Sequence, residues 1–412
     1  MSEGYEKMTA GIPETSGFTN IPFGKLGIIA MKGTEEISKK IDQYIVKWRE
    51  ENINLNSPVN IAGYMKDSYL INYSAPRFGS GEAKAVVGET VRGYDIYIIM
   101  DPFNYSVTYK MYGMEVPMSP DDHYADLKRI IGAISGKARR ITVVMTMLYE
   151  GRQHRRTSRE SLDCAMALQE LVAMGVDSVI TFDAHDPRVG NAIPLNGLEN
   201  ISPIYQMIKA LIRTTPDIRL DADHLMIVSP DEGGMNRAIR YATALGVELG
   251  MFYKRRDYSH IVDGRNPILS HEFLGSNIHG KDVIVVDDMI SSGESMLEVT
   301  AKLKELGAND IYVCCCFGLF CNGLELFDKA YENGTLCKVL TTNTIYATPE
   351  LKERPWYVPV DMSKYIALII DAINHDVSIG TLMNPNDRIQ NILAKHQAEL
   401  AKNDPQQMEI NI

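Results

Sequence analysis

The stretch "VIVVDDMISSGES", residues 283–295, joins a run of β-branched apolar residues to a polar turn of small residues. The run predicts a buried strand, and the turn predicts a loop that leads into a helix over 294–307. In open parallel sheets, ligands bind beyond the carboxyl ends of strands, where the next helix begins. Backbone N–H groups and hydroxyls of this loop are therefore expected to hold a phosphate group. The loop residues concerned are Ser291, Ser292, Gly293 and Ser295.

Two carboxylates, Asp287 and Asp288, precede a loop that is itself suited to an anion. A carboxylate accepts hydrogen bonds and does not donate them, so its natural partner is a donor such as a sugar hydroxyl. The vicinal hydroxyls of a ribose would satisfy both carboxylates while the loop holds a 5-phosphate. The sequence therefore predicts a phosphorylated pentose as ligand. A Walker A loop is excluded, because the pattern Gly-x-x-x-x-Gly-Lys-Ser/Thr does not occur in the chain.

Short apolar runs alternate with amphipathic stretches along the chain, which is typical of stacked β-α units and predicts an α/β fold in two halves. Strands are predicted over 26–31, 94–100, 141–147 and 178–183 in the first half, and over 224–229, 250–254, 282–288, 311–317 and 337–342 in the second. Helices are predicted over 159–175, 235–246, 294–307 and 362–375. The first 20 residues and those after 385 are polar and are expected to be peripheral.

Composition limits the class of protein. The formal net charge is −11, which argues against a general nucleic-acid binder, because nonspecific binding to nucleic acid needs positive charge. The chain has no run of 18 apolar residues and no secretory signal at its N-terminus, so neither a membrane span nor export is expected, and the protein is expected in the cytoplasm. Its six cysteines include three consecutive ones in an apolar run, which predicts buried, reduced thiols.

The 283–295 stretch resembles the phosphoribosyl-binding signature shared by type I phosphoribosyltransferases and ribose-phosphate pyrophosphokinases. Five other stretches resemble the pyrophosphokinases in particular, and the resemblance runs in the same order from residue 68 to residue 385. "RFGSGEAKAVVGETVRGYDIYIIM" (77–100) is similar to the segment that approaches the adenine of ATP, at Phe78 and Glu82. "LYEGRQHRR" (148–156) is similar to the family's Arg-Gln loop, at Arg152 and Gln153.

The remaining similar stretches carry magnesium and catalytic positions. "VITFDAHDP" (179–187) and "VSPDEGG" (228–234) place His185 and Asp231 at positions that bind magnesium in the family, His185 also serving ATP. "FYKRRDYS" (252–259) resembles the mobile catalytic loop, whose lysine and arginine fall on Lys254 and Arg256. The chain departs from the family at Ser80, where an aspartate is usual, and at Glu294, where a glycine is usual. The Glu294 side chain is expected to point away from the phosphate.

The resemblance implies two phosphoribosyltransferase-like domains, each a mainly parallel β-sheet flanked by helices. They would span 21–204 and 205–384, with a peripheral tail over 1–20 and a C-terminal extension over 385–412. It implies a Mg²⁺-dependent ribose-phosphate diphosphokinase that transfers the β,γ-diphosphoryl group of ATP to the 1-hydroxyl of ribose 5-phosphate for nucleotide biosynthesis. Asp287, Asp288 and the 291–295 loop would bind ribose 5-phosphate. The family also implies a homo-oligomer built from dimers, with a hexamer as one form, in which Phe78 and Glu82 serve a neighbour's active site.

Two other functions stay open at this point. One is a type I phosphoribosyltransferase, which consumes the product of that reaction; the Arg-Gln loop and the paired α/β halves argue against it. The other is a catalytically silent regulatory paralogue that binds active partners, against which the retention of Lys254, Arg256, His185 and Asp231 argues. The single positions have plainer interpretations as well, since Asp231 can cap the helix that follows it.

Overall fold

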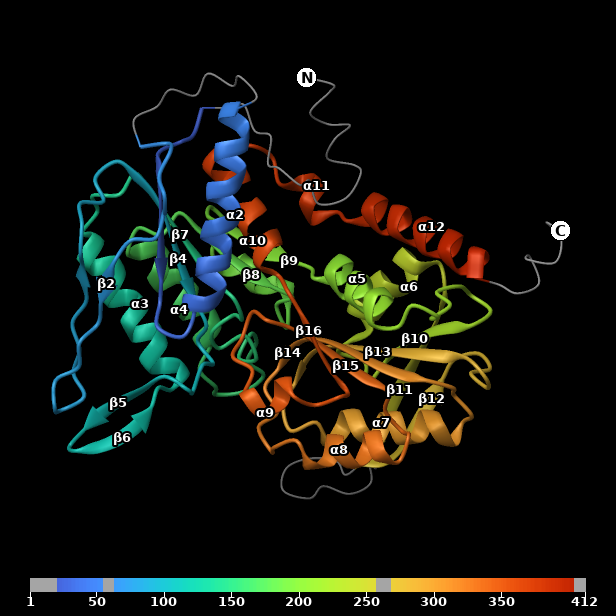
Figure 1. Cartoon of the computed structure of the whole chain (residues 1–412). Helices are drawn as coiled ribbons and strands as arrows, with labels where there is room; N and C mark the ends of the chain where they lie inside the picture. Colours follow the sequence, from blue (N-terminus) through green and yellow to red (C-terminus); the bar gives the residue numbers. More distant parts are fainter. Residues whose placement is uncertain (1–20, 55–62, 257–267, 404–412) are drawn as a thin grey trace. The chain divides into compact units, whose positions relative to one another are not determined.

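The computed structural model describes residues 21–54, 63–256 and 268–403. The chain forms two compact units. The first contains the chain up to Pro203 together with Asn343–Tyr346 and Asp361–Asn384. The second contains Ile204–Thr342, Ala347–Val360 and the chain from Pro385 onward. Each is an α/β unit built on one large sheet (Figure 1).

The first unit is built on a sheet of five parallel strands in the order β1-β4-β7-β8-β9. The strands are β1 (Lys25–Ala30), β4 (Tyr94–Met100), β7 (Arg140–Met145), β8 (Ser178–Phe182) and β9 (Gly197–Ile201). All seven residues of β4 are buried, as expected of a central parallel strand with helices on both faces. Apolar residues of α3 (Pro120–Ile134) and α4 (Asp163–Ala173) pack into the core on one face. α2 (Glu35–Asn54) and α10 (Ser363–Asn374) lie side by side in the same unit (Figure 1).

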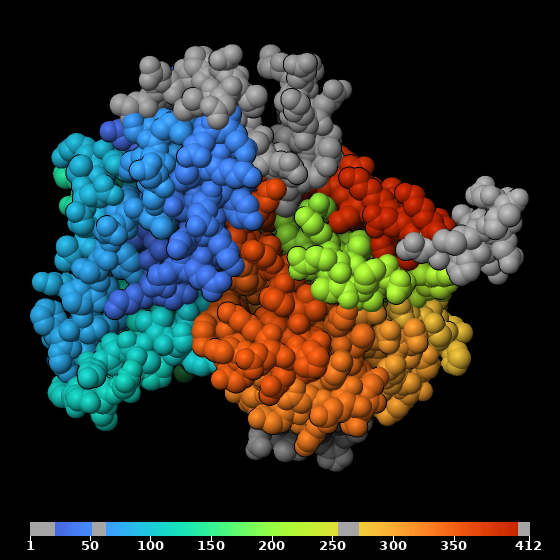
Figure 2. Space-filling model, in the orientation of Figure 1, coloured from blue at the N-terminus to red at the C-terminus, as the bar shows by residue number. Residues whose placement is uncertain are grey.

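A β-hairpin stands out from the body of the first unit (Figure 1). It joins β5 (Thr108–Met111) to β6 (Met114–Pro117) by the two residues Tyr112 and Gly113, both with positive φ, as a two-residue turn between twisted strands requires. Tyr112 is 77% exposed and Met114 is 59% exposed. The hairpin therefore adds apolar side chains to the surface of this unit, part of which Figure 2 shows. A two-residue turn at Tyr-Gly was not expected from the sequence.

The second unit is built on a sheet of seven strands in the order β12-β11-β10-β13-β14-β15-β16. All neighbouring strands run parallel except β11 and β12, which are antiparallel. The strands are β10 (Leu225–Ser229), β11 (Glu248–Arg256), β12 (Ile268–Leu274), β13 (Asp282–Ile290), β14 (Ile311–Gly318), β15 (Lys338–Thr342) and β16 (Tyr357–Val360). The predicted fold class, a mainly parallel sheet flanked by helices in each half, is confirmed.

Helices cover both faces of this second sheet (Figure 1). α7 (Glu294–Glu305) and α8 (Glu325–Glu332) pack into the core on one face, while α5 (Ile204–Thr214) and α6 (Met235–Leu245) lie on the other. The short helix α9 (Pro349–Lys352) precedes β16. The three consecutive cysteines lie in β14 and are buried, as predicted, and burial raises the pKa of Cys314 to about 12. Over the described part of the chain, no helix has the length and apolar character needed to cross a membrane.

The C-terminal part of the chain is distributed differently from the predicted domains. α10 was expected to close a C-terminal domain over 205–384, but residues Asp361–Asn384 belong to the first unit. The predicted extension contains α12 (Asn386–Asn403), which packs on α5 and α6 in the second unit. There, Gln390 Nε2 donates to the Ala244 carbonyl at 2.9 Å. The predicted N-terminal tail, residues 1–20, lies outside the described residues.

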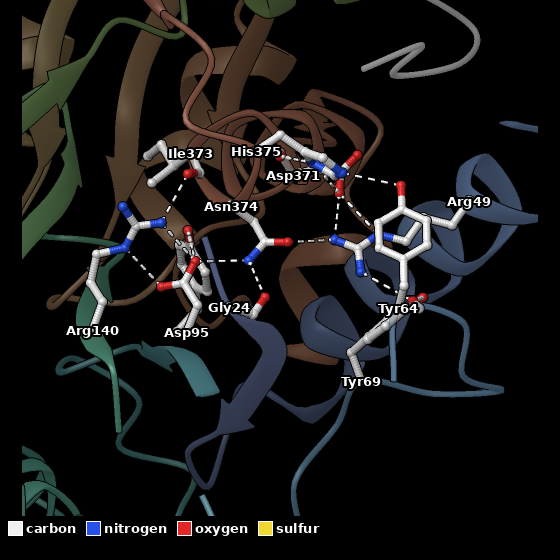
Figure 3. Close-up of polar contacts among 11 residues, drawn as sticks. Gly24, Arg49, Tyr64, Tyr69, Asp95, Arg140, Asp371, Ile373, Asn374 and His375 are labelled. Carbon is white, nitrogen blue, oxygen red and sulfur yellow. Dashed lines mark hydrogen bonds and ion pairs between the residues drawn. The ribbon is translucent and has the colours of Figure 1, made fainter. Parts of the chain in front are cut away.

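A buried polar network gives the physical reason why α10 joins the first unit (Figure 3). Arg49 on α2 donates to Asp371 Oδ1 on α10 at 2.8 Å and to Asn374 Oδ1 at 2.7 Å. Asn374 Nδ2 in turn donates to Asp95 Oδ2 at the start of β4 at 2.8 Å, and Asp95 pairs with Arg140 on β7 at 2.7 Å. A buried charge is tolerated only when it is paired and hydrogen-bonded. Without α10, Arg49 and Asp95 would lose these partners.

Removing the central cation of this network is expected to destabilise the protein strongly. Arg49→Met leaves the Asp371 carboxylate, whose side chain is fully buried, without its guanidinium partner. Breaking a buried pair from one side costs about 3–5 kcal/mol. The matched control is Lys47→Met on the same helix, since Lys47 is exposed and forms only a 3.7 Å pair with Glu51. Denaturant unfolding of the full chain should show a large loss for Arg49→Met and almost none for Lys47→Met; equal midpoints would contradict the proposed role of the network.

Candidate active site

The paired aspartates lie where the sequence predicted, at the carboxyl end of the strand β13. β13 is flanked by β10 and β14, both parallel to it, so three strand ends meet at this edge. Asp288 is buried and Asp287 is half-buried. The backbone N–H of Asp288 donates to Asp287 Oδ1 at 2.9 Å, which holds the first carboxylate against the chain that follows it. Two adjacent acids therefore stand just before the loop, Asp288 buried and Asp287 partly exposed to water.

A buried cation that the sequence did not indicate lies beside these acids. Arg237 Nη1 on α6 is 3.6 Å from Asp287 Oδ1 and 4.0 Å from Asp288 Oδ1. Burial raises the pKa of Asp287 well above its usual range, the charge of Asp288 raises it further, and Arg237 lowers it. Arg237 stands 50 positions before Asp287 in the chain. Only the pairing of β10 with β13, which no local pattern shows, brings the two together.

The loop after β13 requires glycine at one position, where it packs against the core of the unit. Gly293 has φ +87°, and a Cβ at this position would lie 2.3 Å from a ring carbon of Phe327. Glycine is therefore required both by the left-handed conformation and by the space. The loop is held by the segment that follows β14, since the Cys321 N–H donates to the Ser291 carbonyl at 2.9 Å. Ser292 is half-buried, Ser295 is exposed, and α7 begins directly after Gly293.

The side chain of Glu294 has a partner on the neighbouring loop. Asn322 Nδ2 donates to Glu294 Oε1 at 3.3 Å, and both side chains are exposed. The carboxylate therefore engages the loop after β14. That Glu294 points away from a bound phosphate stays a prediction.

The N-cap of α6 is Gly234, which has no side-chain cap hydrogen bond, so Asp231 forms a turn before the helix and not the cap that was its plainer interpretation. Its Oδ1 accepts from the Gly233 N–H at 2.9 Å and from the Gly234 N–H at 3.2 Å, just before α6 begins. Ser229 Oγ donates to the Asp231 carbonyl at 2.6 Å. Asp231 follows β10, the parallel neighbour of β13, so it lies at the same edge of the sheet as the paired aspartates. One carboxylate oxygen of Asp231 is thus engaged in a turn, which is compatible with a metal role for the carboxylate.

Lys254 and Arg256 lie on a strand, where a loop was expected. β11 continues to Arg256 and pairs antiparallel with β12, Lys254 opposite His271 and Arg256 opposite Ile268. The register shifts between residues 255 and 256, so the two-residue alternation of a regular strand does not carry across this point. The predicted loop therefore begins later than the sequence suggested, because β12 supplies a partner strand that its mixed sequence did not reveal. Residues 257–267 lie outside the described part of the chain.

In the first unit, the segments that follow β7 and β8 come together at the carboxyl edge of its sheet. The His154 ring lies 5.3 Å from the His185 ring, measured between centroids, and His154 Nε2 is 3.5 Å from Asp186 Oδ2. His185 and Arg152 are exposed. Gln153 Nε2 donates to the Ser161 carbonyl at 2.9 Å. The structure thus joins the Arg-Gln loop to the segment of His185, through His154, a residue that the sequence analysis did not single out.

Phe78 and Glu82 form the two ends of a tight turn. The Phe78 N–H donates to the Glu82 carbonyl at 2.7 Å, and the Phe78 ring is 54% exposed. Ser80 Oγ donates to Glu82 Oε2 at 2.9 Å, so the residue that departs from the family is part of the turn itself. The turn lies against the β5–β6 hairpin, where the Tyr112 N–H donates to the Gly79 carbonyl at 2.8 Å. The exposed ring of Phe78 is available for stacking.

No cluster of three or more histidine, cysteine, aspartate or glutamate side chains suited to a metal occurs within the described ranges. Magnesium is a hard cation that keeps several waters and is usually bound through one or two protein groups plus substrate phosphates. Asp231, with its carboxylate oxygens at the edge of the sheet, fits such a site, and the exposed imidazole of His185 is accessible to a metal–nucleotide complex. His185 in the first unit and Asp231 in the second are each suited to give one ligand to a magnesium ion that takes most of its other ligands from water and substrate oxygens.

Comparisons with known proteins agree with this arrangement. Residues 26–175 match the model of the N-terminal domain of ribose phosphate pyrophosphokinase, and residues 197–353 match that of a phosphoribosyl transferase domain. The chain is 30% identical over 275 residues to a ribose-phosphate pyrophosphokinase of Clostridium acetobutylicum, covering 65% of this chain and 76% of that protein. It is 26% identical over 314 residues to the one of Vibrio cholerae, covering 75% and 90%.

A solved structure shares the fold. The crystal structure of phosphoribosylpyrophosphate synthetase from Mycobacterium smegmatis superposes with a TM-score of 0.68 at 20% identity, covering 85% of this chain and 99% of that one. The family resemblance inferred from the motifs is confirmed by the matched models and relatives. The chain belongs to the ribose-phosphate pyrophosphokinase family of enzymes.

Proposed function

We propose that the protein transfers the β,γ-diphosphoryl group of ATP to the 1-hydroxyl of ribose 5-phosphate, giving 5-phosphoribosyl 1-diphosphate and AMP. The observation that carries this proposal is the edge of β13, where Asp287 and Asp288 precede a loop whose glycine is required by φ and by space. The carboxylates accept from the ribose hydroxyls, and the loop and the start of α7 hold the 5-phosphate. Membership of the family supports the same reaction, which supplies nucleotide biosynthesis.

The catalytic roles follow from what phosphoryl transfer needs. Such reactions depend on positioning and on stabilisation of charge in the transition state more than on covalent help. Lys254 and Arg256 stabilise the negative charge of the transferring group as the 1-hydroxyl attacks the β-phosphorus. Phe78 stacks on the adenine, Glu82 accepts from it, and Arg152, Gln153 and His185 contact the phosphates of ATP. We also infer that the protein works as a homo-oligomer in which Phe78 and Glu82 reach a neighbouring subunit's nucleotide.

Magnesium is the cofactor that the proposed reaction requires. Bound Mg²⁺ neutralises charge on substrate phosphate oxygens and orients them. His185 and Asp231 are the residues of this chain that we assign to it. They leave most of its coordination positions to water and to phosphate oxygens.

The direct test is an assay for AMP formed from ATP in the presence and absence of ribose 5-phosphate. We expect AMP and 5-phosphoribosyl diphosphate in equal amounts, and only when both substrates are present. A phosphoribosyltransferase would instead release diphosphate from 5-phosphoribosyl diphosphate and a base. A silent regulatory paralogue would give neither reaction alone. Either of these last two results would overturn the proposed function.

Removal of Mg²⁺ should abolish turnover, and loss of the His185 side chain should weaken the binding of Mg–ATP. Treatment with EDTA is expected to stop AMP formation, and added Mg²⁺ to restore it. His185→Ala should raise the Mg–ATP concentration needed for half-maximal rate by about 10–100-fold, the range seen when groups that support a metal are lost. The matched control is His224→Ala, because His224 precedes the amino end of β10 and is remote from the carboxyl edge. Full activity in metal-free enzyme would remove the roles given to His185 and Asp231.

A further inference from the structure

The buried guanidinium of Arg237 faces the two acids of the candidate pentose site from a separate element. Arg237 is the third residue of α6 and is 7% exposed. Its Nη1 atom is 3.6 Å from Asp287 Oδ1 and 4.0 Å from Asp288 Oδ1. These separations exceed those of a hydrogen bond, for which N–H···O distances of about 2.7–3.2 Å are usual. Arg237 therefore acts on both carboxylates through its charge, since these two contacts are too long for a bidentate fork.

Two adjacent carboxylates, one buried and one half-buried, oppose one another's ionisation. A like charge in a shared site and removal from water both favour the neutral acid, whereas an opposite charge within about 4–6 Å favours the carboxylate. A neutral carboxylic acid carries a proton that it would donate, so it is a poorer acceptor for a sugar hydroxyl. Asp287 and Asp288 can both accept hydrogen bonds only if a positive charge offsets the repulsion between them. Arg237 is a cation in the right place to do so.

The other groups around Asp287 do not supply this charge. Among the described residues with a stated effect on it, Asp288 lies on the same strand and Arg237 on α6. On the neighbouring strand β14, Cys315 stands opposite Asp287 in the register. Burial raises the pKa of the Cys315 thiol well above its usual range, and the two aspartates raise it further, so this thiol is neutral at physiological pH. Among the described residues with a stated effect on Asp287, Arg237 is the cation.

We propose that Arg237 is a positioning residue of the pentose site, whose positive charge favours the ionised form of Asp287 and Asp288, the form that accepts hydrogen bonds from the ribose hydroxyls. The inference rests on the proposed function, because it names a further residue for the same site. It also explains how two acids can stand next to one another before a loop that is expected to hold a phosphate. The site carries a counter-charge on α6, which favours the ionised form of the two acids against burial and their mutual repulsion.

The test compares three variants of the full-length protein. Arg237→Met removes the charge and keeps an extended side chain, Arg237→Lys keeps the charge, and Arg240→Met removes an exposed arginine from the same helix as a matched control. The readout is the pH dependence of kcat/KM for ribose 5-phosphate. We expect Arg237→Met to move the acidic limb of the profile upward by about one to three pH units, since it removes an opposite charge at this distance. Arg237→Lys and Arg240→Met should keep profiles close to that of the unchanged protein.

Other outcomes separate the alternatives. A folded Arg237→Met protein with an unchanged acidic limb would overturn the inference. If Arg237→Met does not fold, the Arg237→Lys variant distinguishes the two roles. A role through charge predicts a nearly normal pH profile for Arg237→Lys, whereas a role through the shape of the side chain predicts a displaced profile. The ionisation of the pair can also be followed without substrate, by infrared titration of the carboxyl bands assigned with Asp287→Asn. An upward shift of that titration in Arg237→Met, together with an absence of AMP formation in the unchanged protein, would support the electrostatic role and reject the proposed reaction.

Discussion

Replacing Lys254 or Arg256 with alanine is expected to lower kcat by about 10³-fold or more, the largest loss that we predict for any single substitution. An arginine that stabilises charge in a phosphoryl-transfer transition state contributes about 10³–10⁵ in rate. If both residues act only while the β-phosphorus is attacked, their contribution belongs to the transition state and not to bound substrate. The KM values for ATP and ribose 5-phosphate should therefore change little, and kcat and kcat/KM should fall together.

The control for this experiment is an exposed lysine of the same unit. Lys302 on α7 is exposed and pairs only with Glu305, so Lys302→Ala should keep nearly normal kcat. Steady-state kinetics at saturating Mg²⁺ would measure both effects, and circular dichroism would confirm that each variant is folded. Near-normal kcat in Lys254→Ala and Arg256→Ala would mean that the basic run is a solvated part of the β11–β12 hairpin. In that case the catalytic assignment would be wrong.

Replacing Asp288 with asparagine is expected to raise the ribose 5-phosphate requirement by about 10–100-fold while the requirement for ATP stays nearly constant. A hydrogen bond to a charged acceptor contributes about 1.5–3 kcal/mol, which corresponds to this range. Asparagine keeps the shape of the buried side chain and removes the charge, so the fold should remain intact. The KM for each substrate and the binding of ribose 5-phosphate measured by calorimetry give the result.

The matched control lies at the other end of the same strand. Asp282 begins β13 at its amino end, where its Oδ1 accepts from Asn309 Nδ2 at 2.7 Å. Asp282→Asn should leave both KM values unchanged, because no ligand is expected at that edge. An unchanged pentose requirement in a folded Asp288→Asn protein would remove the role assigned here to the paired acids, and with it the reason for the Arg237 cation.

The elements that the sequence could predict are those whose cause is local. β4, β13 and β14 are continuous apolar runs, and such runs form buried parallel strands because both of their faces are covered. The small-residue turn between β13 and α7 could be predicted for the same reason, since a turn between a strand and a helix is defined by adjacent residues. Each family motif is likewise a short stretch that can be compared position by position. The three strands were therefore found at their predicted places, whereas Lys254 and Arg256 lie on a strand where a loop was expected.

What only the tertiary structure decided concerns partners that are far apart in the chain. Asp371 meets Arg49 across 322 positions, so no local pattern could show that α10 completes the first unit. β12 has a mixed sequence and forms a strand because its backbone pairs with β11. Lys254 and Arg256 therefore lie in a paired strand of the sheet. Arg237 reaches Asp287 only because β10 and β13 pair. A charged side chain is buried where folding also brings its counter-charge, and that counter-charge can come from a distant part of the sequence.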